Sequence, residues 1–255
     1  MQQSSSTTSS PTLDPNEVDR FARMAADWWD PKGQFRPLHE LGPARMQYLR
    51  DEIMRHFERT SLDQPLAGLH ALDIGCGGGL VAEPLARMGA RVTGIDPGAD
   101  TVAAARAHAE PQGLAIDYRV ARIEEIAESG ETFDVVTCLE VVEHIPDVSA
   151  FLTAAATCVR PGGLLIASTL NRTMKSYALA IVAAEYILRW LPPGTHDWNR
   201  FVRPEEMTIY FNRAGLEPPH FTGLVLDPIR DRWSLSADTG VNYFAAAARA
   251  TRKPT

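Results

Sequence analysis

The stretch of sequence that decides the fold is Leu72-Asp73-Ile74-Gly75-Cys76-Gly77-Gly78-Gly79. An apolar run ends here in an acidic residue and passes into closely spaced glycines, and the residues that follow have helical spacing. Glycines allow a ligand to press against the backbone, and the amino terminus of a helix offers N–H groups without partners. The stretch therefore predicts a strand, a ligand-binding loop and a helix, which together open a parallel α/β sheet.

Short apolar runs alternate with helical segments through the rest of the chain. We expect helices over 80–88, 100–110, 147–159 and 204–214, and strands over 69–74, 91–96, 115–120, 133–139, 164–169, 221–227 and 241–247. This alternation is typical of βαβ units. The last two strands have no full helix between them, which predicts a closing antiparallel hairpin. The predicted fold class is α/β, a Rossmann-like sheet of seven strands.

The chain divides into three regions: a disordered tail over 1–13, an N-terminal helical cap over 14–64, and a ligand-binding domain over 65–255 with a helical insertion over 172–198 ahead of the sixth strand. In the cap, Asp14 is expected to cap a helix that starts at Pro15. A Pro/Gly break over 31–37 separates it from a second helix over 42–57.

The composition disfavours several classes of protein. The 255 residues include 25 basic and 32 acidic side chains, so the net charge of −7 argues against nucleic acid as a partner, which needs clustered Lys and Arg. Cys76, Cys138 and Cys158 show none of the paired spacings of zinc or redox sites, and they favour a reducing cytoplasm. The N-terminus lacks the pattern of a secretory signal, and no apolar run reaches the roughly 20 residues of a membrane span. A cytoplasmic location is therefore expected.

A carboxylate on the next strand completes the ligand-binding pattern. Asp96 ends that strand 23 residues after Asp73, where a carboxylate can accept hydrogen bonds from a ribose diol. The motif resembles the first motif of class I S-adenosylmethionine-dependent methyltransferases, Asp-x-Gly-x-Gly-x-Gly, here Asp73, Gly75, Gly77 and Gly79. Further support comes from Phe133-Asp134-Val135-Val136 and Pro161-Gly162-Gly163. A shifted Gly-x-Gly-x-x-Ala frame leaves a nicotinamide or flavin dinucleotide site as an alternative, although that frame gives Asp73 no role.

Five segments outside the sheet core make a closer resemblance. They are Trp28-Trp29-Asp30-Pro31, Phe35-Arg36-Pro37-Leu38-His39, Ser168-Thr169-Leu170-Asn171-Arg172, Ala184-Glu185-Tyr186-Ile187-Leu188 and Gly194-Thr195-His196-Asp197-Trp198. Together they resemble the ubiquinone-biosynthesis O-methyltransferase family. The resemblance implies an enzyme that methylates catechol-type hydroxyls on a polyprenylated ring, at both O-methylation steps of coenzyme Q synthesis. A methyltransferase of another small phenol or carboxylate, and a non-catalytic scaffold that binds lipid, are the alternatives.

The resemblance implies contacts with S-adenosylmethionine at Arg45, Gly75, Asp96 and Leu139, and the glycine motif adds Asp73 and Gly77. Arg45 is expected to pair with the methionine carboxylate, and Asp96 to hold the ribose. Leu139 is expected to pack against the adenine, although Met is common at this position in the family. Without the family, a lone helical Arg would more simply be a solvated residue.

Three residues after the fourth strand are the candidates for catalysis. Glu140, Glu143 and His144 stand at i, i+3 and i+4, which would place them on one side of a helical turn. As ligands they would suit a divalent cation such as Mg²⁺, which lowers the pKa of a bound phenol, although Mg²⁺ prefers oxygen to nitrogen. Without a metal, His144 is the better general base. The sequence leaves both interpretations open.

The insertion contains a helix over 174–191 that is apolar on most of its surface. Because a polyprenyl substrate resides in the bilayer, we expect this helix, which includes Ile181 and Ile187, to contact the membrane surface or to cover the lipid tail. Core packing is the alternative. Trp28 and Trp29 are expected either to form a lid over the cofactor or simply to pack on the domain. The resemblance also implies a complex with other enzymes of ubiquinone biosynthesis.

Overall fold

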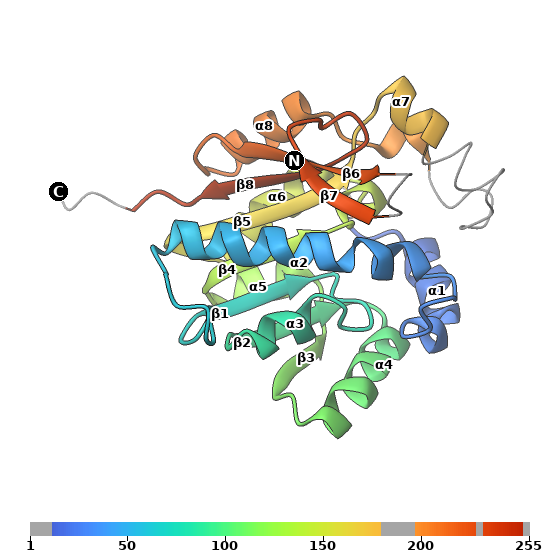
Figure 1. Ribbon diagram of the computed structural model, residues 1–255, viewed down its shortest axis with the longest axis vertical. Coiled ribbons are helices and arrows are strands. Elements are labelled where there is room, and N and C mark those ends of the chain that lie inside the picture. Colours follow the sequence, from blue (N-terminus) through green and yellow to red (C-terminus); the bar gives the residue numbers. More distant parts are fainter. Residues whose placement is uncertain (1–11, 180–196, 228–231, 252–255) are drawn as a thin grey trace, which may run out of the picture.

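A single sheet crosses the centre of the computed structural model, which describes residues 12–179, 197–227 and 232–251 (Figure 1). Its strand order is β3-β2-β1-β4-β5-β8-β6-β7. The strands of the described residues are β1 (His70–Ile74), β2 (Arg91–Asp96), β3 (Ile116–Val120), β4 (Phe133–Leu139), β5 (Val159–Leu170), β6 (His220–Asp227), β7 (Arg232–Ser236) and β8 (Asn242–Ala248). Strands β1 to β5 are parallel, whereas β6, β7 and β8 pair antiparallel. The predicted α/β fold class is confirmed.

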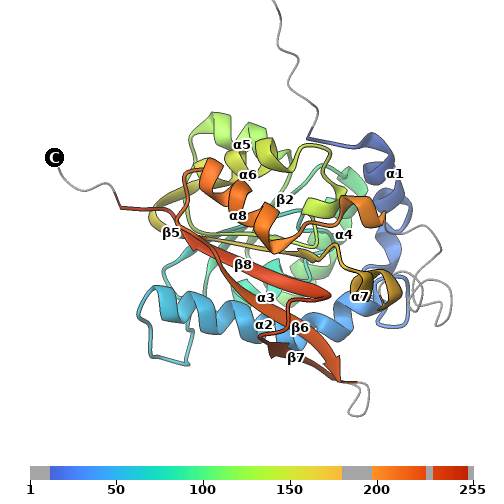
Figure 2. The ribbon, with the colours of Figure 1, turned by 90° about the horizontal axis from the view of Figure 1, so that it is seen from above.

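Helices cover both faces of this sheet (Figure 2). One face carries α2 (Arg36–His56), α3 (Ala82–Arg87) and α4 (Ala99–Ala109), and the other carries α5 (Ile123–Ser129), α6 (Val148–Thr157) and α8 (Pro204–Arg213). Successive residues of a strand enter opposite layers: Leu164 and Ile166 pack on the α2 side, and Leu165 and Ala167 on the α6 side. Burial on both faces explains why β4, whose residues are all buried, is mainly apolar and does not alternate in polarity.

Shorter helical pieces lie at the ends of the strands and before the sheet. Those described are α1 (Pro15–Arg23), η1 (Ala25–Asp27), η2 (Glu110–Gln112), η3 (Val142–His144), α7 (Met174–Ser176) and η5 (Trp198–Arg200). As expected, the Asp14 side chain caps α1 by accepting a hydrogen bond from the Asn16 N–H at 3.1 Å. The loops after β1, β2 and β4 meet at one edge of the sheet, because parallel strands end on the same side.

The sheet has one strand more than the seven predicted. The two late strands expected over 221–227 and 241–247 do pair antiparallel, but β7 lies between them in sequence and joins the outer edge of β6. Its sequence alternates polar and apolar residues, and Trp233 and Leu235 pack only partly against the core. An edge strand that pairs with one neighbour needs no continuous apolar run, so the sequence carried little signal for it.

The helix expected over 42–57 begins earlier, at Arg36. Pro37 lies in its first turn, where a missing N–H is tolerated, so this proline does not mark the end of the break as the sequence suggested. Leu49 and Ile53 are fully buried against the sheet. The region predicted as one cap therefore has two parts, because α2 belongs to the layer on the sheet and only α1 and η1 stand at its edge.

Two further regions bear on the predictions. The helix α5 was not predicted. It has only seven residues, IEEIAES, and only Ile123 and Ile126 are buried, so its sequence carries little helical periodicity.

The tail over 1–13 and the helix over 174–191, with Ile181 and Ile187, lie largely or wholly outside the described residues. Within the described ranges, none of the helices has both the length and the apolar character needed to cross a membrane.

The place of α2 in the core can be tested by truncating Leu49. We expect Leu49→Ala to lower the free energy of unfolding by about 2 to 5 kcal/mol, because the side chain is fully buried and leaves a cavity. Urea denaturation followed by circular dichroism measures this. Leu62→Ala is the matched control, since Leu62 is 76% exposed and its loss should change the free energy by less than about 0.5 kcal/mol. Equal effects of the two substitutions would contradict the assignment of α2 to the core.

Candidate active site

A cavity of about 580 Å³ opens at the edge of the sheet where the parallel strands end. Its floor is formed by three segments: the loop after β1 from Gly75 to Gly79, which we call the glycine loop, the end of β2, and the chain from the end of β4 onward. They contribute Gly75, Gly77, Asp96, Leu139, Glu140 and His144. The opposite side, which we call the N-terminal wall, contributes Glu17, Phe21, Trp28 and Phe35. Most of the residues predicted for cofactor binding and catalysis thus line one cavity, and Arg45 joins them from α2.

The glycine loop is shaped by close contacts that leave no room for side chains. Gly75 and Gly77 have positive φ angles of 68° and 53°. A Cβ at Gly77 would lie 2.4 Å from the Trp28 ring, and one at Gly75 would lie 2.6 Å from Val141. Glycine is therefore required at both positions for conformation as well as for space.

Asp96 ties the loop to the neighbouring strand. Its carboxylate accepts hydrogen bonds from the Gly77 N–H at 3.2 Å and the Gly98 N–H at 2.8 Å. Burial raises the pKa of Asp96 to about 6, and the two backbone donors oppose that rise. The side chain lines the cavity with acceptor capacity left over, which suits a ligand that carries a pair of hydroxyls.

Asp73 and Arg45 are almost completely buried. Asp73 accepts a hydrogen bond from the Thr137 hydroxyl at 2.8 Å, and burial raises its pKa to about 7. It does not line the cavity, so the structure places it beneath the loop rather than beside a ligand. Arg45 is 3% exposed, and its Nε has no hydrogen-bond partner among the described residues. Burial lowers the pKa of Arg45, while the carboxylates of Glu140 and Asp73 counteract this, so an anionic ligand group would suit its free donor.

Two hydroxyl groups of β5 hold the carboxylates of the segment after β4. Glu140 has a positive φ of 56° and accepts a hydrogen bond from the Ser168 hydroxyl at 2.7 Å. Glu143 is buried and accepts one from the Thr169 hydroxyl at 2.8 Å. Burial and the neighbouring Glu143 raise the pKa of Glu140. These hydroxyls hold both carboxylates against β5, where Glu140 lines the cavity and Glu143 does not.

The prediction that Glu140, Glu143 and His144 share one side of a helical turn is wrong. The turn η3 begins only at Val142, and the left-handed backbone at Glu140 directs the chain differently before it. Among the residues that the structure describes, no three His, Cys, Asp or Glu side chains are grouped as a metal ion needs. The donor set therefore does not fit a metal held by these three side chains.

His144 instead pairs with a residue of the N-terminal wall. Its Nδ1 lies 2.8 Å from a carboxylate oxygen of Glu17, and the Phe21 ring meets the imidazole edge-on at a centroid distance of 5.4 Å. The hydrogen bond to His144 lowers the pKa of Glu17, against the opposing effect of burial. Neither Glu17 nor Phe21 was predicted as a site residue. Their four-residue spacing on one helix was visible in the sequence, but nothing local indicates which distant residue that face meets.

Comparison with known proteins identifies the relatives of this chain. The sequence matches a family described as a methyltransferase domain over residues 72–167. A ubiquinone biosynthesis O-methyltransferase from Methylobacterium nodulans is 53% identical over 245 residues, which cover 96% of this chain and 98% of the relative. A relative of the same name from Azorhizobium caulinodans is 52% identical over 238 residues, which cover 93% and 94% of the two chains.

Solved structures with lower identity agree on the fold. The magnesium protoporphyrin IX methyltransferase of Synechocystis, with bound S-adenosylmethionine, matches 95% of this chain and 100% of its own, with a TM-score of 0.60 and 19% identity. An S-adenosylmethionine-dependent methyltransferase of Clostridium acetobutylicum matches 92% and 100%, with a TM-score of 0.59 and 12% identity. Identities this low show the fold alone. With 52–53% identity over nearly the full length of both chains, the chain belongs to the ubiquinone biosynthesis O-methyltransferases.

Proposed function

We propose that this chain methylates phenolic hydroxyls of polyprenylated ubiquinone precursors, at both O-methylation steps of coenzyme Q synthesis. As a member of its family it is an S-adenosylmethionine-dependent O-methyltransferase. The observation that carries the proposal is the full-length match to relatives that bear this name, at 52–53% identity. The cavity supports it, since it is large enough for a nucleoside and brings Asp96, Arg45 and His144 to one place.

The donor would be held by the residues of the floor. Asp96 would accept hydrogen bonds from the ribose, and Leu139 would pack against the adenine. The loop at Gly75 and Gly77 would allow the donor to approach the backbone, with Asp73 supporting the loop from below. Arg45 would pair its free Nε with the methionine carboxylate.

His144 would remove the phenolic proton. Because its Nδ1 contacts Glu17, that carboxylate favours the tautomer that carries hydrogen on Nδ1 and leaves Nε2 free to accept a proton. Glu140 and Glu143 would stabilise the imidazolium that forms, since both carboxylates lie in the same segment. Bound S-adenosylmethionine would supply its methyl group by in-line displacement from the sulfonium. The N-terminal wall would exclude water from the reacting atoms.

The insertion would bring the enzyme to the bilayer surface. At the described start of the segment 174–191, Met174, Tyr177 and Leu179 are 73%, 42% and 50% exposed. Several large apolar side chains exposed within six residues are unusual on a protein that meets only water. A peripheral association with the membrane would give access to substrates with a long prenyl tail. The cytoplasmic location and the complex with other enzymes of the pathway stay predictions.

Methyl transfer itself is the direct test. The protein should transfer a labelled methyl group from S-adenosylmethionine to a short-chain prenyl catechol, with product identified by mass spectrometry. His144→Ala should lower kcat at least about 100-fold, because a positioned general base contributes that much, while the affinity for S-adenosylhomocysteine stays unchanged.

Two outcomes would contradict parts of this proposal. Methyl transfer to simple phenols or small carboxylates, but to no prenyl catechol, would show that the substrate is not a polyprenylated phenol. A loss of activity in a chelator that Mg²⁺ restores would return Glu140, Glu143 and His144 to the role of metal ligands, whereas full activity in the chelator supports His144 as the base.

Donor binding should depend on pH through Asp96. Its pKa of about 6 means that the carboxyl becomes protonated as the pH falls below that value and loses acceptor capacity for the ribose. We expect the Kd for S-adenosylhomocysteine, measured by calorimetry, to rise by up to about tenfold per pH unit below about pH 6. Because Asp73 titrates near pH 7, the comparison with Asp96→Asn isolates the contribution of Asp96. That variant should bind weakly at every pH, and a wild-type Kd that is flat between pH 8 and pH 5 would refute this role.

Membrane association should depend on the exposed side chains of the insertion. We expect a triple substitution of Met174, Tyr177 and Leu179 by Ser to reduce sedimentation with vesicles of phosphatidylcholine and phosphatidylglycerol by about tenfold, because buried apolar area drives interfacial binding. Ile209→Ser is the control, since Ile209 is 50% exposed on α8. Unchanged sedimentation of the triple variant would show that this surface does not bind vesicles.

A further inference from the structure

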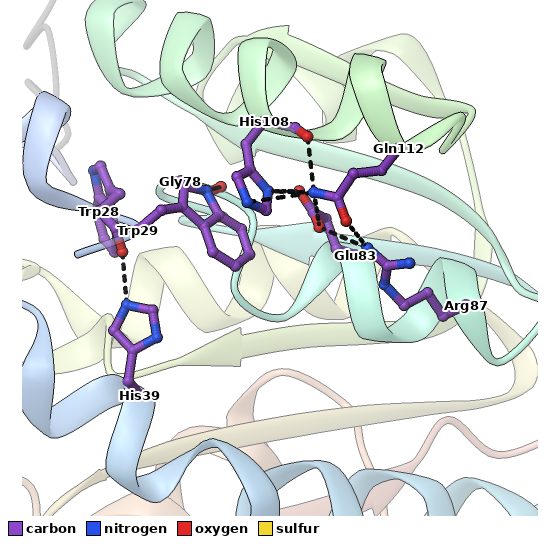
Figure 3. Close-up of polar contacts among 8 residues, drawn as sticks. All are labelled: Trp28, Trp29, His39, Gly78, Glu83, Arg87, His108 and Gln112. Atoms are coloured by element: carbon purple, nitrogen blue, oxygen red, sulfur yellow. Dashed lines mark hydrogen bonds and ion pairs between the residues drawn. The ribbon is translucent and has the colours of Figure 1, made fainter. Parts of the chain in front are cut away.

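Besides Trp28, the neighbouring Trp29 contacts the glycine loop (Figure 3). The Trp29 indole N–H donates a hydrogen bond to the Gly78 carbonyl at 2.9 Å. Its ring stacks on the imidazole of His108, with centroids 3.4 Å apart and planes 8° from parallel. Trp29 does not line the cavity, so its contacts serve the position of the loop and the wall rather than a ligand.

His108 is itself held by a buried carboxylate. Its Nδ1 lies 2.6 Å from Glu83, which is 1% exposed, and Arg87 and Gln112 also contact this carboxylate (Figure 3). Glu83 stands in the first turn of α3, and its N–H donates to the Gly79 carbonyl at 3.0 Å. Trp29 is therefore fixed at two points, directly at the glycine loop and at His108 of α4, which in turn pairs with Glu83 of α3.

The neighbouring Trp28 belongs to the cavity. Its ring packs on Gly77 and Gly78 so closely that a Cβ at either position would lie within 2.5 Å of it, and it stacks on Phe35 with centroids 3.7 Å apart. His39 of α2 contacts the Trp28 carbonyl at 2.8 Å. By contrast, α1 has no fully buried residue. The N-terminal wall is thus anchored mainly at its tryptophan pair.

We propose that Trp29 and His108, supported by Glu83, form a latch that holds the N-terminal wall against the glycine loop and so positions the methyl donor. The three are positioning residues, because none of them lines the cavity. Opening the latch would release Trp28 from the loop and let the wall move away from the donor. The latch therefore sets how fast the donor and its product leave. This inference rests on the proposed use of the cavity for S-adenosylmethionine.

The test is the dissociation rate of S-adenosylhomocysteine, measured by stopped-flow fluorescence on the full chain. Trp29→Phe keeps a stacking ring but loses the hydrogen bond, and it should raise the rate about threefold. Trp29→Leu and His108→Ala each lose the stack and should raise the rate about tenfold. Because the two residues act through one contact, the double variant Trp29→Leu/His108→Ala should release S-adenosylhomocysteine less than about twofold faster than either single variant.

Matched substitutions separate the latch from a general loss of stability. His220→Ala removes a histidine that pairs with the buried Glu52 at 3.0 Å, and Trp233→Phe changes a tryptophan whose indole nitrogen has no partner among the described residues. Neither residue lines the cavity, and both controls should leave the dissociation rate within twofold of wild type even where His220→Ala lowers Tm. In the latch variants, KM for the donor should rise by a larger factor than kcat at saturating donor falls.

Three outcomes would overturn the proposal. Dissociation rates of the folded Trp29→Phe and His108→Ala variants within twofold of wild type would show that the contacts are only structural, as would an equal acceleration by His220→Ala. Multiplication of the two single effects in the double variant would show that Trp29 and His108 act separately. If the wild type bound no S-adenosylhomocysteine, the proposed function would fail before the latch is tested, so the two failures are distinguishable.

Discussion

The hydrogen bond from the Gly77 N–H to Asp96 is the contact on which the arrangement of the site depends. It joins the loop after β1 to the end of β2, and it forms only because glycine can adopt the positive φ that turns this N–H toward the carboxylate. The same backbone conformation presents a flat surface, without side chains, to Trp28. One contact thus determines where a nucleoside would lie and where the N-terminal wall comes to rest.

The electrostatics of the cavity favour a cationic ligand. Burial raises the pKa values of Asp73, Asp96 and Glu140, because each carboxylate loses hydration. The charge of Arg45 opposes this rise at Asp73 and Glu140, and two backbone N–H groups oppose it at Asp96. A positive charge placed among these groups would favour their ionised forms and would gain from them in return. A sulfonium donor carries that charge before the reaction and its sulfide product does not. In the proposed use of the cavity, this loss of charge would weaken the binding of the product and so help it to leave.

Particular residues show what the sequence could and could not predict. The motif from Asp73 to Gly79 and the runs of buried strands are local patterns, so the fold class and most strands followed from them. The start of α2 was placed too late, because Pro37 was taken as a breaker although a first turn tolerates proline. The supposed ligand set failed for a similar reason: spacing implies a shared face only if the backbone is helical, and Glu140 is not.

The contacts that could not be predicted are those between the N-terminal wall and the rest of the molecule. Glu17 meets His144, and Trp29 meets His108, across separations that carry no periodic signal in one sequence. The first pair links the N-terminal segment to the floor of the cavity at the proposed base, and the second links it to α4 behind the glycine loop. The proposed base is therefore oriented only while the wall is in place, so proton removal and the exclusion of water would depend on the same closed arrangement.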